Sequence, residues 1–357
     1  MNRDGDLAAL ALDPGYRAVL DGLRAAPRRW LVTGAAGFIG SHLVEALLEL
    51  GQRVVGLDDL STGYRTNLDD VARRVGAEAI ERLDFRVGDV TDADAVAAAM
   101  AGVDVVLHHA ALVSVPESID DPWRAHRVNA TGFLNVLDAA RHAGARVVYA
   151  ASSASYGDDD APAKVEGRVG RVLSMYAATK SANELYATAF AQAYGTTAVG
   201  LRYFNVFGSR QDPNGAYAAV IPAWIDRLAR AEACMVHGDG GQTRDFCHVA
   251  NVVGANLLAA TVAPSADLEP VFNVGTGHAT TLLKLFDAIR DALAAREPER
   301  ANLGGARRVH GPVRPGDIRH SCADVGLAQR RLAYRAAVGL REGIDRTLGW
   351  YLGGAVG

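Results

Sequence analysis

The sequence has few cysteines, no long apolar run and almost no net charge. Cys234, Cys247 and Cys322 are widely spaced and form no C-x-x-C pair, so we expect neither a disulfide framework nor a structural zinc site. No stretch approaches the ~18 consecutive apolar residues that span a bilayer. The charged N-terminus also lacks the apolar run of a signal peptide. These absences predict a cytoplasmic protein that does not contact a membrane and holds no metal.

The charge balance excludes further classes of partner. The chain has 37 Lys+Arg and 41 Asp+Glu, a formal net charge of −4, whereas nucleic-acid-binding surfaces are usually basic. The balance does not exclude a small polyanion, which a few arginines can bind. Domains usually hold roughly 100–200 residues, so 357 residues suggest two domains, or one large α/β unit with an appended lobe. A hydrophobic content of 49% is sufficient for a substantial core.

Strand-length apolar runs alternate with helical stretches from residue 28 onward. This alternation predicts a parallel sheet with helices on both faces, whose strands should be apolar throughout because both of their faces are buried. An N-terminal extension, 1–27, precedes it and contains one expected short helix, 16–24. Strands are predicted at 30–33, 53–57, 85–87, 103–108, 146–150 and 198–203, and helices at 41–50, 123–142 and 176–194.

The pattern loosens after Asn205, where turn-rich segments separate a strand-like run, 271–274, from a helix-like one, 282–295. We therefore predict an α/β fold: a Rossmann-type doubly wound parallel sheet over residues 28–205, with segments around 245–275 returning to it. A smaller mixed α/β lobe is expected over 206–357.

A glycine-rich turn joins the first predicted strand to the first predicted helix. In Thr33–Gly40 the glycines recur at a spacing of three, which suits a tight turn, close approach of a diphosphate and close helix packing. The helix N-terminus offers free N–H groups to an anion. Asp58 ends the second strand, 18 residues after Gly40, where a carboxylate accepts hydrogen bonds from a ribose and repels a 2′-phosphate. The combination favours NAD over NADP.

A candidate catalytic group follows in the second half of the predicted sheet. Tyr176 and Lys180 are spaced i, i+4 and share one face of a helix. A phenol is a weak base at neutral pH, but an adjacent ammonium and a cationic nicotinamide would lower its pKa and favour the phenolate. Ser152 ends the fifth strand, and ligands of open α/β sheets bind beyond the carboxyl ends of strands. The Tyr–Lys pair could therefore remove a proton from a sugar hydroxyl, and Ser152 could hydrogen-bond a substrate oxygen beside Tyr176.

At this point the chain resembles the extended short-chain dehydrogenase/reductases, and within them the nucleotide-sugar 4-epimerases. The resemblance extends from Trp30 to Trp350 and rests on motifs distributed along that length. These are T-G-x-x-G-F-I-G at 33–40, D-D-L-S-T-G at 58–63, G-D-V at 88–90, H-A-A at 109–111, V-N-A-T-G at 128–132, S-S-A-S-Y-G at 152–157, Y-A-A-T-K at 176–180, R-Y-F-N-V-F-G at 202–208, R-D-F-C-H-V at 244–249 and R-P-G-D at 314–317.

The resemblance implies roles for individual residues. Ser152, Tyr176 and Lys180 would be catalytic. NAD would be held by Gly34, Gly37, Phe38, Ile39, Gly40, Asp58, Asp59, Ser61, Thr62, Gly63, Asp89, Val90, Ala110, Ala111, Asn129, Tyr176, Lys180 and Phe204. A UDP-sugar would bind mainly in the lobe of 206–357, with contacts from Val113, Ser152, Ser153, Asn205, Val220, His237, Arg244, Arg314, Asp317 and Ser321. The two arginines suit a diphosphate, which guanidinium binds bidentately.

Two positions indicate the size of the sugar. Galactose epimerases resemble one another in a bulky Tyr where this chain has Ser321, and the bacterial galactose enzyme has a Lys where this chain has Val113. Smaller side chains leave room for a 2-N-acetyl group. The chain thus resembles bacterial UDP-N-acetylglucosamine 4-epimerases of O-antigen and capsule synthesis, some of which act on the uronic acid. The implied reaction is reversible inversion at C4 through a 4-keto sugar, with tightly bound NAD.

Other interpretations are open or disfavoured. A UDP-glucose/UDP-galactose 4-epimerase or a promiscuous one is the alternative enzyme, and an NAD-binding scaffold is the alternative without catalysis. The related 4,6-dehydratases carry an Asp-Glu pair where this chain has Ser153 and Ala154, so dehydration is not expected. His108 and His109 are adjacent on a strand and face opposite ways, which disfavours a shared metal. The helices 123–142 and 176–194 resemble those that form a homodimer in this superfamily.

Overall fold

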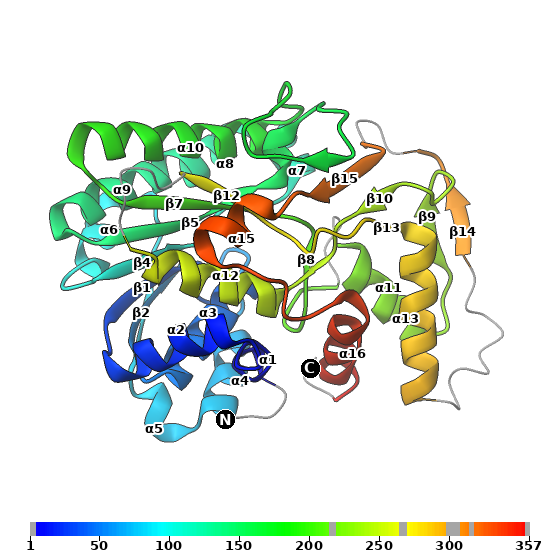
Figure 1. Ribbon diagram of the computed structural model, residues 1–357, viewed down its shortest axis with the longest axis horizontal. Helices are drawn as coiled ribbons and strands as arrows, with labels where there is room; N and C mark the ends of the chain where they lie inside the picture. Colours follow the sequence, from blue (N-terminus) through cyan, green and yellow to red (C-terminus); the bar gives the residue numbers. More distant parts are fainter. Residues whose placement is uncertain (1–4, 214–218, 264–269, 298–307, 314–317, 354–357) are drawn as a thin grey trace.

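The computed structural model describes residues 5–213, 219–263, 270–297, 308–313 and 318–353. A seven-stranded parallel sheet crosses the larger part of the molecule in the order β12-β7-β5-β4-β1-β2-β3 (Figure 1). This confirms the predicted Rossmann-type α/β fold. Its strands are β1 (Arg29–Thr33), β2 (Arg53–Asp58), β3 (Leu83–Val87), β4 (Val105–His108), β5 (Arg146–Ser152), β7 (Ala198–Tyr203) and β12 (Val271–Val274).

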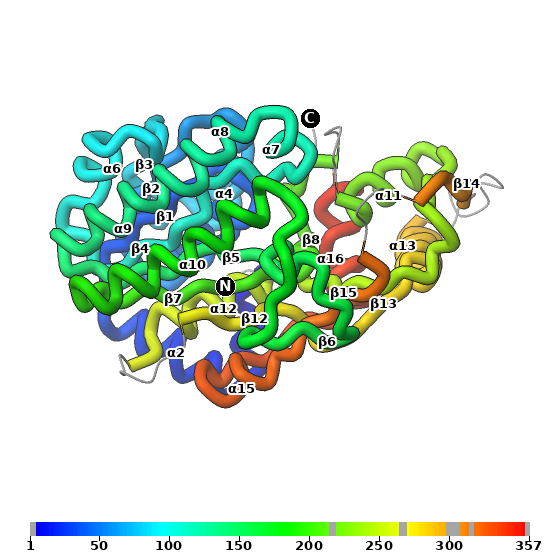
Figure 2. The backbone as a smooth tube through the Cα atoms, turned by 90° about the horizontal axis from the view of Figure 1, so that it is seen from above, coloured from blue at the N-terminus to red at the C-terminus, as the bar shows by residue number. Residues whose placement is uncertain are grey.

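Alternate side chains of the central strands enter two separate cores. Trp30 and Val32 of β1 face one core, whereas Leu31 faces the other. The first core is closed by α1 (Asp6–Leu10), α2 (Pro14–Ala25), α3 (Phe38–Glu49), α4 (Arg65–Val75), α12 (Val249–Thr261) and α15 (Gly326–Leu332). The second is closed by α6 (Ala93–Ala99), α9 (Gly132–Ala143) and α10 (Met175–Tyr194). Figure 2 looks down onto α9 and α10, which lie side by side across the sheet.

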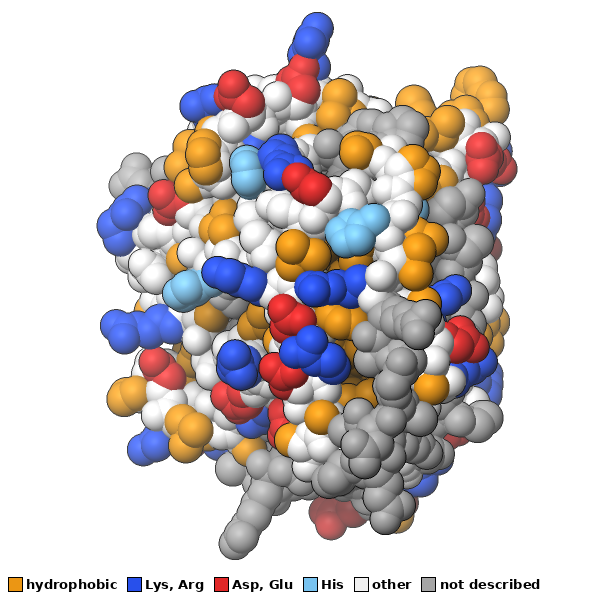
Figure 3. Space-filling view, turned by 90° about the vertical axis from the view of Figure 1, so that its right-hand side faces the viewer, with side chains coloured by type: hydrophobic (Ala, Val, Ile, Leu, Met, Phe, Trp, Pro, Cys, Tyr) orange, Lys and Arg blue, Asp and Glu red, His pale blue; other side chains and the backbone are white. Residues whose placement is uncertain are grey.

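The third core lies in a smaller lobe beyond the carboxyl ends of the strands. It is formed by residues of α11 (Val220–Ala229), α13 (Leu282–Arg296) and α16 (Leu340–Leu352), together with β9 (Cys234–His237). Short strands complete the lobe: β6 (Ala163–Lys164), β8 (Val206–Phe207), β10 (Thr243–Arg244), β11 (Cys247–His248), β13 (Thr280–Thr281), β14 (Arg308–Gly311) and β15 (His320–Ala323). The surface over this lobe carries interspersed charges of both signs (Figure 3).

Three sequence-based expectations need correction. β3 is at the edge of the sheet with a single neighbour, and each of its five residues, which include Asp84 and Arg86, is half-buried or exposed, so it is neither apolar throughout nor buried. The helix predicted over 123–142 is α8 (Pro122–His126), a π-helical turn (Arg127–Thr131) and α9. The N-terminal extension contains α1 besides the predicted helix. A short α5 (Ala77–Ile80), α7 (Val115–Asp120) and the 3-10 turn Ser153–Tyr156 complete the elements that concern the site.

Candidate active site

A cleft of about 750 Å³ opens at the carboxyl ends of β1, β2, β4 and β5. This is where ligands bind in open α/β sheets, because the strand order reverses there and loops diverge. Predicted site residues from six separate motifs, together with Val113, line it. They are Gly34, Gly37, Phe38, Ile39, Gly40, Asp58, Asp59, Ser61, Thr62, Gly63, Asp89, Val90, Ala110, Ala111, Val113, Ser152, Tyr176 and Lys180.

The glycine turn is too tight for side chains. Gly34 has φ +69°, and a Cβ on it would be 2.8 Å from the nitrogen of Ala110. A Cβ on Gly40 would be 1.9 Å from the Gly34 carbonyl oxygen, so α3 packs directly against the turn. No side chain caps α3 at Gly37, which leaves the first N–H groups of that helix available to an anion. The turn therefore has the form that a dinucleotide diphosphate needs.

Asp58 is held in a fixed orientation at the end of β2. Its Oδ2 accepts a 2.8 Å hydrogen bond from the Ala36 N–H, and its Oδ1 accepts one of 2.8 Å from the Leu60 N–H. Burial raises the pKa of the carboxyl, and the backbone hydrogen bonds oppose that rise. A Cβ at Gly63 would approach both oxygens within about 3 Å, so only glycine leaves them accessible there. The residues present fit the adenosine ribose of NAD.

Ser152, Tyr176 and Lys180 come together at the far end of this cleft. Ser174 caps α10 by accepting from Ala177, and the Tyr176 N–H donates to Ser118 Oγ at 3.0 Å, which fixes the start of the helix. One turn later the Lys180 Nζ lies 5.9 Å from the centre of the Tyr176 ring. The side chain of Ser152, at the end of β5, hydrogen-bonds that of Tyr176.

The pKa values of this pair differ from the expectation. Burial raises the pKa of Tyr176 above its usual value, and the hydrogen bond with Ser152 only partly opposes that effect. Burial also lowers the pKa of Lys180 to about 8. The expected depression of the Tyr176 pKa by Lys180 is not found in the chain alone, where burial and the contact with Ser152 account for the shift. A positive charge from a bound nicotinamide would favour the phenolate.

Other predicted site residues that the structure describes do not line the cleft. Asn129 is buried in the π-helical turn and hydrogen-bonds the backbone of Leu112 and the Thr179 hydroxyl. Phe204 is fully buried beside Tyr156. Ser153 begins the 3-10 turn. Arg314 and Asp317 lie outside the described residues.

The remaining predicted substrate contacts do not line the cleft, but Asn205 and Val220 each adjoin a residue that does, Val206 and Ala219. Asn205 donates to the Asp245 carbonyl at 3.1 Å. Arg244 of β10 pairs in register with Ser321 of β15, whose side chain is only 4% exposed. Val220 begins α11, and His237 ends β9. These residues surround the site without lining it in this conformation.

The sequence reasoning missed several residues that line the cleft. Tyr64 follows the predicted NAD loop, and its hydroxyl donates a 2.6 Å hydrogen bond to Asp212. Arg210, Gln211 and Asp212 line the cleft from the segment after β8. The signal available was their position in a turn-rich segment directly after the R-Y-F-N-V-F-G motif. Ser114, Glu117, Arg124 and Val128 also contribute, from α7, α8 and the adjoining turns.

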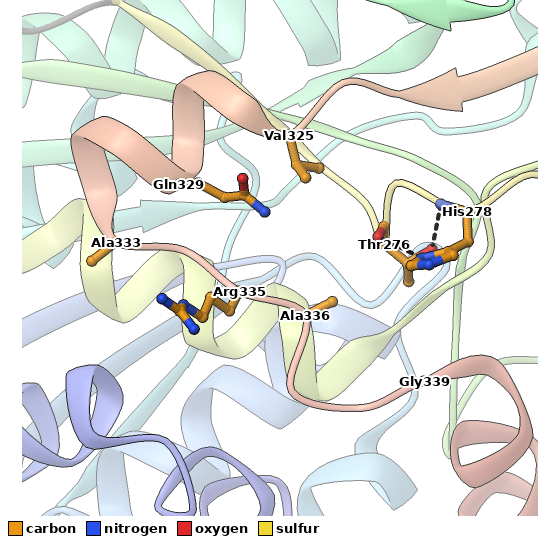
Figure 4. A pocket seen from close by; sticks show the side chains of 8 residues that line it. All are labelled: Thr276, His278, Val325, Gln329, Ala333, Arg335, Ala336 and Gly339. Atoms are coloured by element: carbon orange, nitrogen blue, oxygen red, sulfur yellow. Dashed lines mark hydrogen bonds between the residues drawn. The ribbon is translucent and has the colours of Figure 1, made fainter.

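A second cavity, of about 510 Å³, lies beside α15 and shares no residue with the cleft (Figure 4). Thr276 and His278 border it from the loop after β12, and the His278 N–H donates to the Thr276 hydroxyl at 3.2 Å. Gln329 and Arg335 face it from the opposite wall. It is separate from the candidate active site.

Neither a metal cluster nor a membrane span is found in the part of the chain that the structure describes. No three His, Cys, Asp or Glu side chains there are grouped to hold a metal ion. None of the helices within those residues combines the length and apolarity that crossing a bilayer requires. His108 is hydrogen-bonded to Thr33 at 2.8 Å, and His109 to the Tyr203 hydroxyl at 2.8 Å.

Comparison with known proteins agrees with this geometry. The NAD dependent epimerase/dehydratase family matches residues 30–275. A UDP-glucose 4-epimerase of Mycolicibacterium smegmatis is 38% identical over 327 residues, which cover 90% of this chain and 98% of that protein. A solved UDP-N-acetylglucosamine 4-epimerase of Methanobrevibacter ruminantium, in complex with UDP-N-acetylmuramic acid, is 35% identical with a TM-score of 0.82, covering 92% of this chain and 99% of that one.

A solved UDP-glucose 4-epimerase of Thermus thermophilus, in complex with NAD, is 34% identical with a TM-score of 0.77, covering 91% of this chain and 99% of that one. These proteins share a reaction at C4 of a nucleotide sugar but differ in the sugar that they are named for. The similarity extends over nearly the whole of each relative. The chain therefore belongs to the NAD dependent epimerase/dehydratase family and is a nucleotide-sugar 4-epimerase that uses NAD.

Proposed function

We propose that the chain interconverts UDP-N-acetylglucosamine and UDP-N-acetylgalactosamine by reversible inversion at C4. The observation that carries the proposal is the continuity of one cleft from the glycine turn at Gly34 to Tyr176 and Lys180. A dinucleotide bound along the turn would present its nicotinamide beside the tyrosine. The small side chains of Ser321 and Val113 support the N-acetylated sugar over the plain one.

The proposed chemistry assigns one proton and one hydride to separate groups. The Tyr176 phenolate takes the proton from O4 as the C4–H bond breaks, and a C4=O double bond forms. NAD⁺, when bound, supplies the acceptor for the hydride and returns it. Ser152 donates a hydrogen bond to the new carbonyl oxygen. Tyr176 then returns the proton to O4 after the hydride has reached the opposite face of C4, so the cofactor is regenerated.

Inversion requires the keto sugar to turn over while its nucleotide remains bound. Arg244 with Arg314 would hold the diphosphate, because guanidinium groups bind phosphate bidentately. Asn205 and Asp317 would orient the nucleotide, with Val220 and His237 near it. The sugar then rotates about the diphosphate and presents its other face to the nicotinamide.

Two chemically related kinds of substrate are the alternatives. The uronic acid of the N-acetylhexosamine has the same 2-substituent, so the size of residue 321 does not discriminate against it. UDP-glucose and UDP-galactose are smaller and would fit the same space, which makes a promiscuous epimerase the second candidate. A scaffold without catalysis is disfavoured, since Ser152, Tyr176 and Lys180 are all present in one cleft.

We also propose a homodimer through the helices on the upper face of Figure 1. Trp123 of α8 is 73% exposed and Leu185 of α10 is 72% exposed, and the two helices are in contact. Large exposed apolar side chains on adjoining helices are typical of an interface. Light scattering of the wild type and of Leu185→Lys tests this: a dimer that dissociates in the variant supports it, and a monomeric wild type contradicts it.

The decisive experiment is a direct assay without added cofactor. The purified chain is incubated with UDP-N-acetylglucosamine, its uronic acid and UDP-glucose in separate reactions, and the C4 configuration of the products is read by NMR. Conversion of the first with the largest kcat/KM supports the proposal. Preference for UDP-glucose would replace it with the plain-sugar epimerase, and no conversion of any would favour the scaffold.

A further inference from the structure

The N-terminal segment contributes a buried ionic contact to the first helix of the nucleotide domain. Asp6 begins α1, and its Oδ2 lies 2.6 Å from Nδ1 of His42 on α3. Both groups are largely buried, with the side chain of His42 only 4% exposed. Burial alone would raise the pKa of Asp6, but the adjacent His42 holds the pKa of that carboxyl well below its usual range. Asp6 is therefore an acceptor, and Nδ1 donates to it.

The other nitrogen of the same imidazole holds a different segment. His42 Nε2 is 3.0 Å from the carbonyl oxygen of Ser209. A carbonyl can only accept, so Nε2 donates to it when the ring is protonated. Burial and the Arg210 guanidinium lower the pKa of His42, and in the neutral ring Nε2 instead accepts from the Ser209 hydroxyl, 3.3 Å away. His42 thus bridges α1 to residues 209–212, which we call the cleft loop. Asp6 fixes the orientation of the ring that makes the second hydrogen bond.

The cleft loop needs external support. Arg210 has φ +63°, a conformation that costs free energy for a residue with a side chain. Its buried guanidinium pairs with Glu45 and, at 3.1 Å, with Asp70. These contacts anchor the middle of the loop, and His42 anchors its beginning at Ser209.

The same loop borders the cofactor cleft. Arg210, Gln211 and Asp212 line both the cleft and a polar cavity on the side of Asp6 and His42. Asp212 accepts the 2.6 Å hydrogen bond from Tyr64, the residue after Gly63 of the expected NAD-binding loop. Hydrogen bonds at Ser209 and Asp212, joined by the backbone of the cleft loop, therefore lead from α1 to the rim of the NAD site.

We propose that Asp6 and His42 are positioning residues for cofactor retention. By fixing the cleft loop they keep Asp212 against Tyr64 and hold the rim of the cleft closed, which slows the release of NAD. The N-terminal segment is then part of the device that retains the cofactor, without touching it. The inference needs NAD binding but not the identity of the sugar, so it stands or fails independently of the proposed substrate.

The test compares three variants of the same helix in the holoenzyme: Asp6→Ala, Asp6→Asn and Leu10→Ala. Asp6→Ala removes the acceptor of His42. Leu10→Ala removes buried packing of α1 against α12, next to Gly254, and leaves His42 untouched. The rate of NAD release is measured enzymatically after rapid dilution, hydrogen exchange is measured over residues 205–213, and the thermal midpoint is recorded for each.

Asp6→Ala is expected to release NAD about tenfold faster, as the loss of one charge-assisted hydrogen bond would give. Exchange over 205–213 should rise with it. Leu10→Ala should lower the thermal midpoint at least as much as Asp6→Ala does. It should change neither the rate of NAD release nor the hydrogen exchange over 205–213. Asp6→Asn, which keeps an acceptor oxygen, should recover most of the retention. The proposal would be overturned if Asp6→Ala released NAD at the wild-type rate, or if Leu10→Ala accelerated NAD release as much as Asp6→Ala does.

Discussion

The ammonium of Lys180 lies 5.9 Å from the centre of the Tyr176 ring and donates a 2.8 Å hydrogen bond to the Ala150 carbonyl. One backbone contact therefore fixes the lysine on the cleft side of β5 while its charge remains near the tyrosine. Because α10 carries both residues one turn apart, their separation is set by helix geometry. The first two predictions follow from this pair.

Replacing Tyr176 with Phe should abolish turnover and retain NAD. The variant loses the group that moves the O4 proton, and loss of general base catalysis typically costs about 10²–10⁴ in rate. Epimerisation is followed by NMR, and bound NAD by absorbance after gel filtration. Tyr194→Phe, at the exposed end of the same helix, is the matched control and should keep the parent rate. Near-parental activity in Tyr176→Phe would refute the assigned role.

Lys180→Met should reveal the cost of burying the lysine. In the folded chain the pKa of Lys180 is about 8, against 10.5 for an ordinary lysine, and the side chain is 2% exposed. The unfolded state therefore binds more protons between these values, and the stability of the wild type rises with pH in that window. The penalty is fully present below about pH 8 and is lost toward pH 10.5.

This difference corresponds to about 3 kcal/mol at most. Denaturant unfolding of the NAD-free proteins at several pH values measures it. Between pH 8 and 10.5, the free energy of unfolding of the wild type should rise relative to that of Lys180→Met. The variant should be inactive at every pH. A constant difference between the two proteins over that window would contradict the assignment of a buried, deprotonating lysine.

Gly40→Ala tests the glycine turn. The new methyl group would meet the backbone of Gly34, which cannot move aside without distorting the turn. We expect a loss of about 1–3 kcal/mol or more in the free energy of unfolding and loss of bound NAD. Gly22→Ala, in helix α2 with no atom within 4 Å of the added carbon, is the control. It should be neutral or stabilise by about 0.5–1 kcal/mol and keep its NAD.

The glycine turn and the Tyr–Lys pair were predictable because local rules determine them. A strand, a run of glycines and a helix specify the segment Arg29–Glu49, and helix periodicity specifies the spacing of Tyr176 and Lys180. The π-helical turn around Asn129 was not predictable in this way. The π-helical turn covers only the five residues Arg127–Thr131, a stretch too short to be separated from the flanking α-helical spacing of apolar residues.

Contacts between single polar residues far apart in the sequence could not be predicted from the hydrophobic pattern either. Asp6 and His42 are separated by 36 positions, and His42 and Ser209 by 167, so no spacing rule connects them. Tyr64 and Asp212 are 148 positions apart. Each contact depends on how the N-terminal segment, α3 and the cleft loop pack together, which is a property of the whole fold.

Ser321→Tyr should change substrate preference. Ser321 is buried in β15 beside Arg244, so a phenol ring there must project toward the proposed sugar site or disturb the strand pair. The ring would fill the space that we assign to the 2-N-acetyl group. We expect kcat/KM for UDP-N-acetylglucosamine to fall at least about tenfold relative to that for UDP-glucose, as a clash of a few atoms would give.

Ser321→Ala separates size from hydrogen bonding, since it removes the hydroxyl without adding volume. It should keep the parent ratio of the two kcat/KM values, and the thermal midpoint of each variant shows whether the strand pair has survived. An unchanged ratio in a well-folded Ser321→Tyr would contradict the pocket-size argument, because the added ring would then lie away from the sugar. The specificity would in that case depend on residues other than the one at position 321.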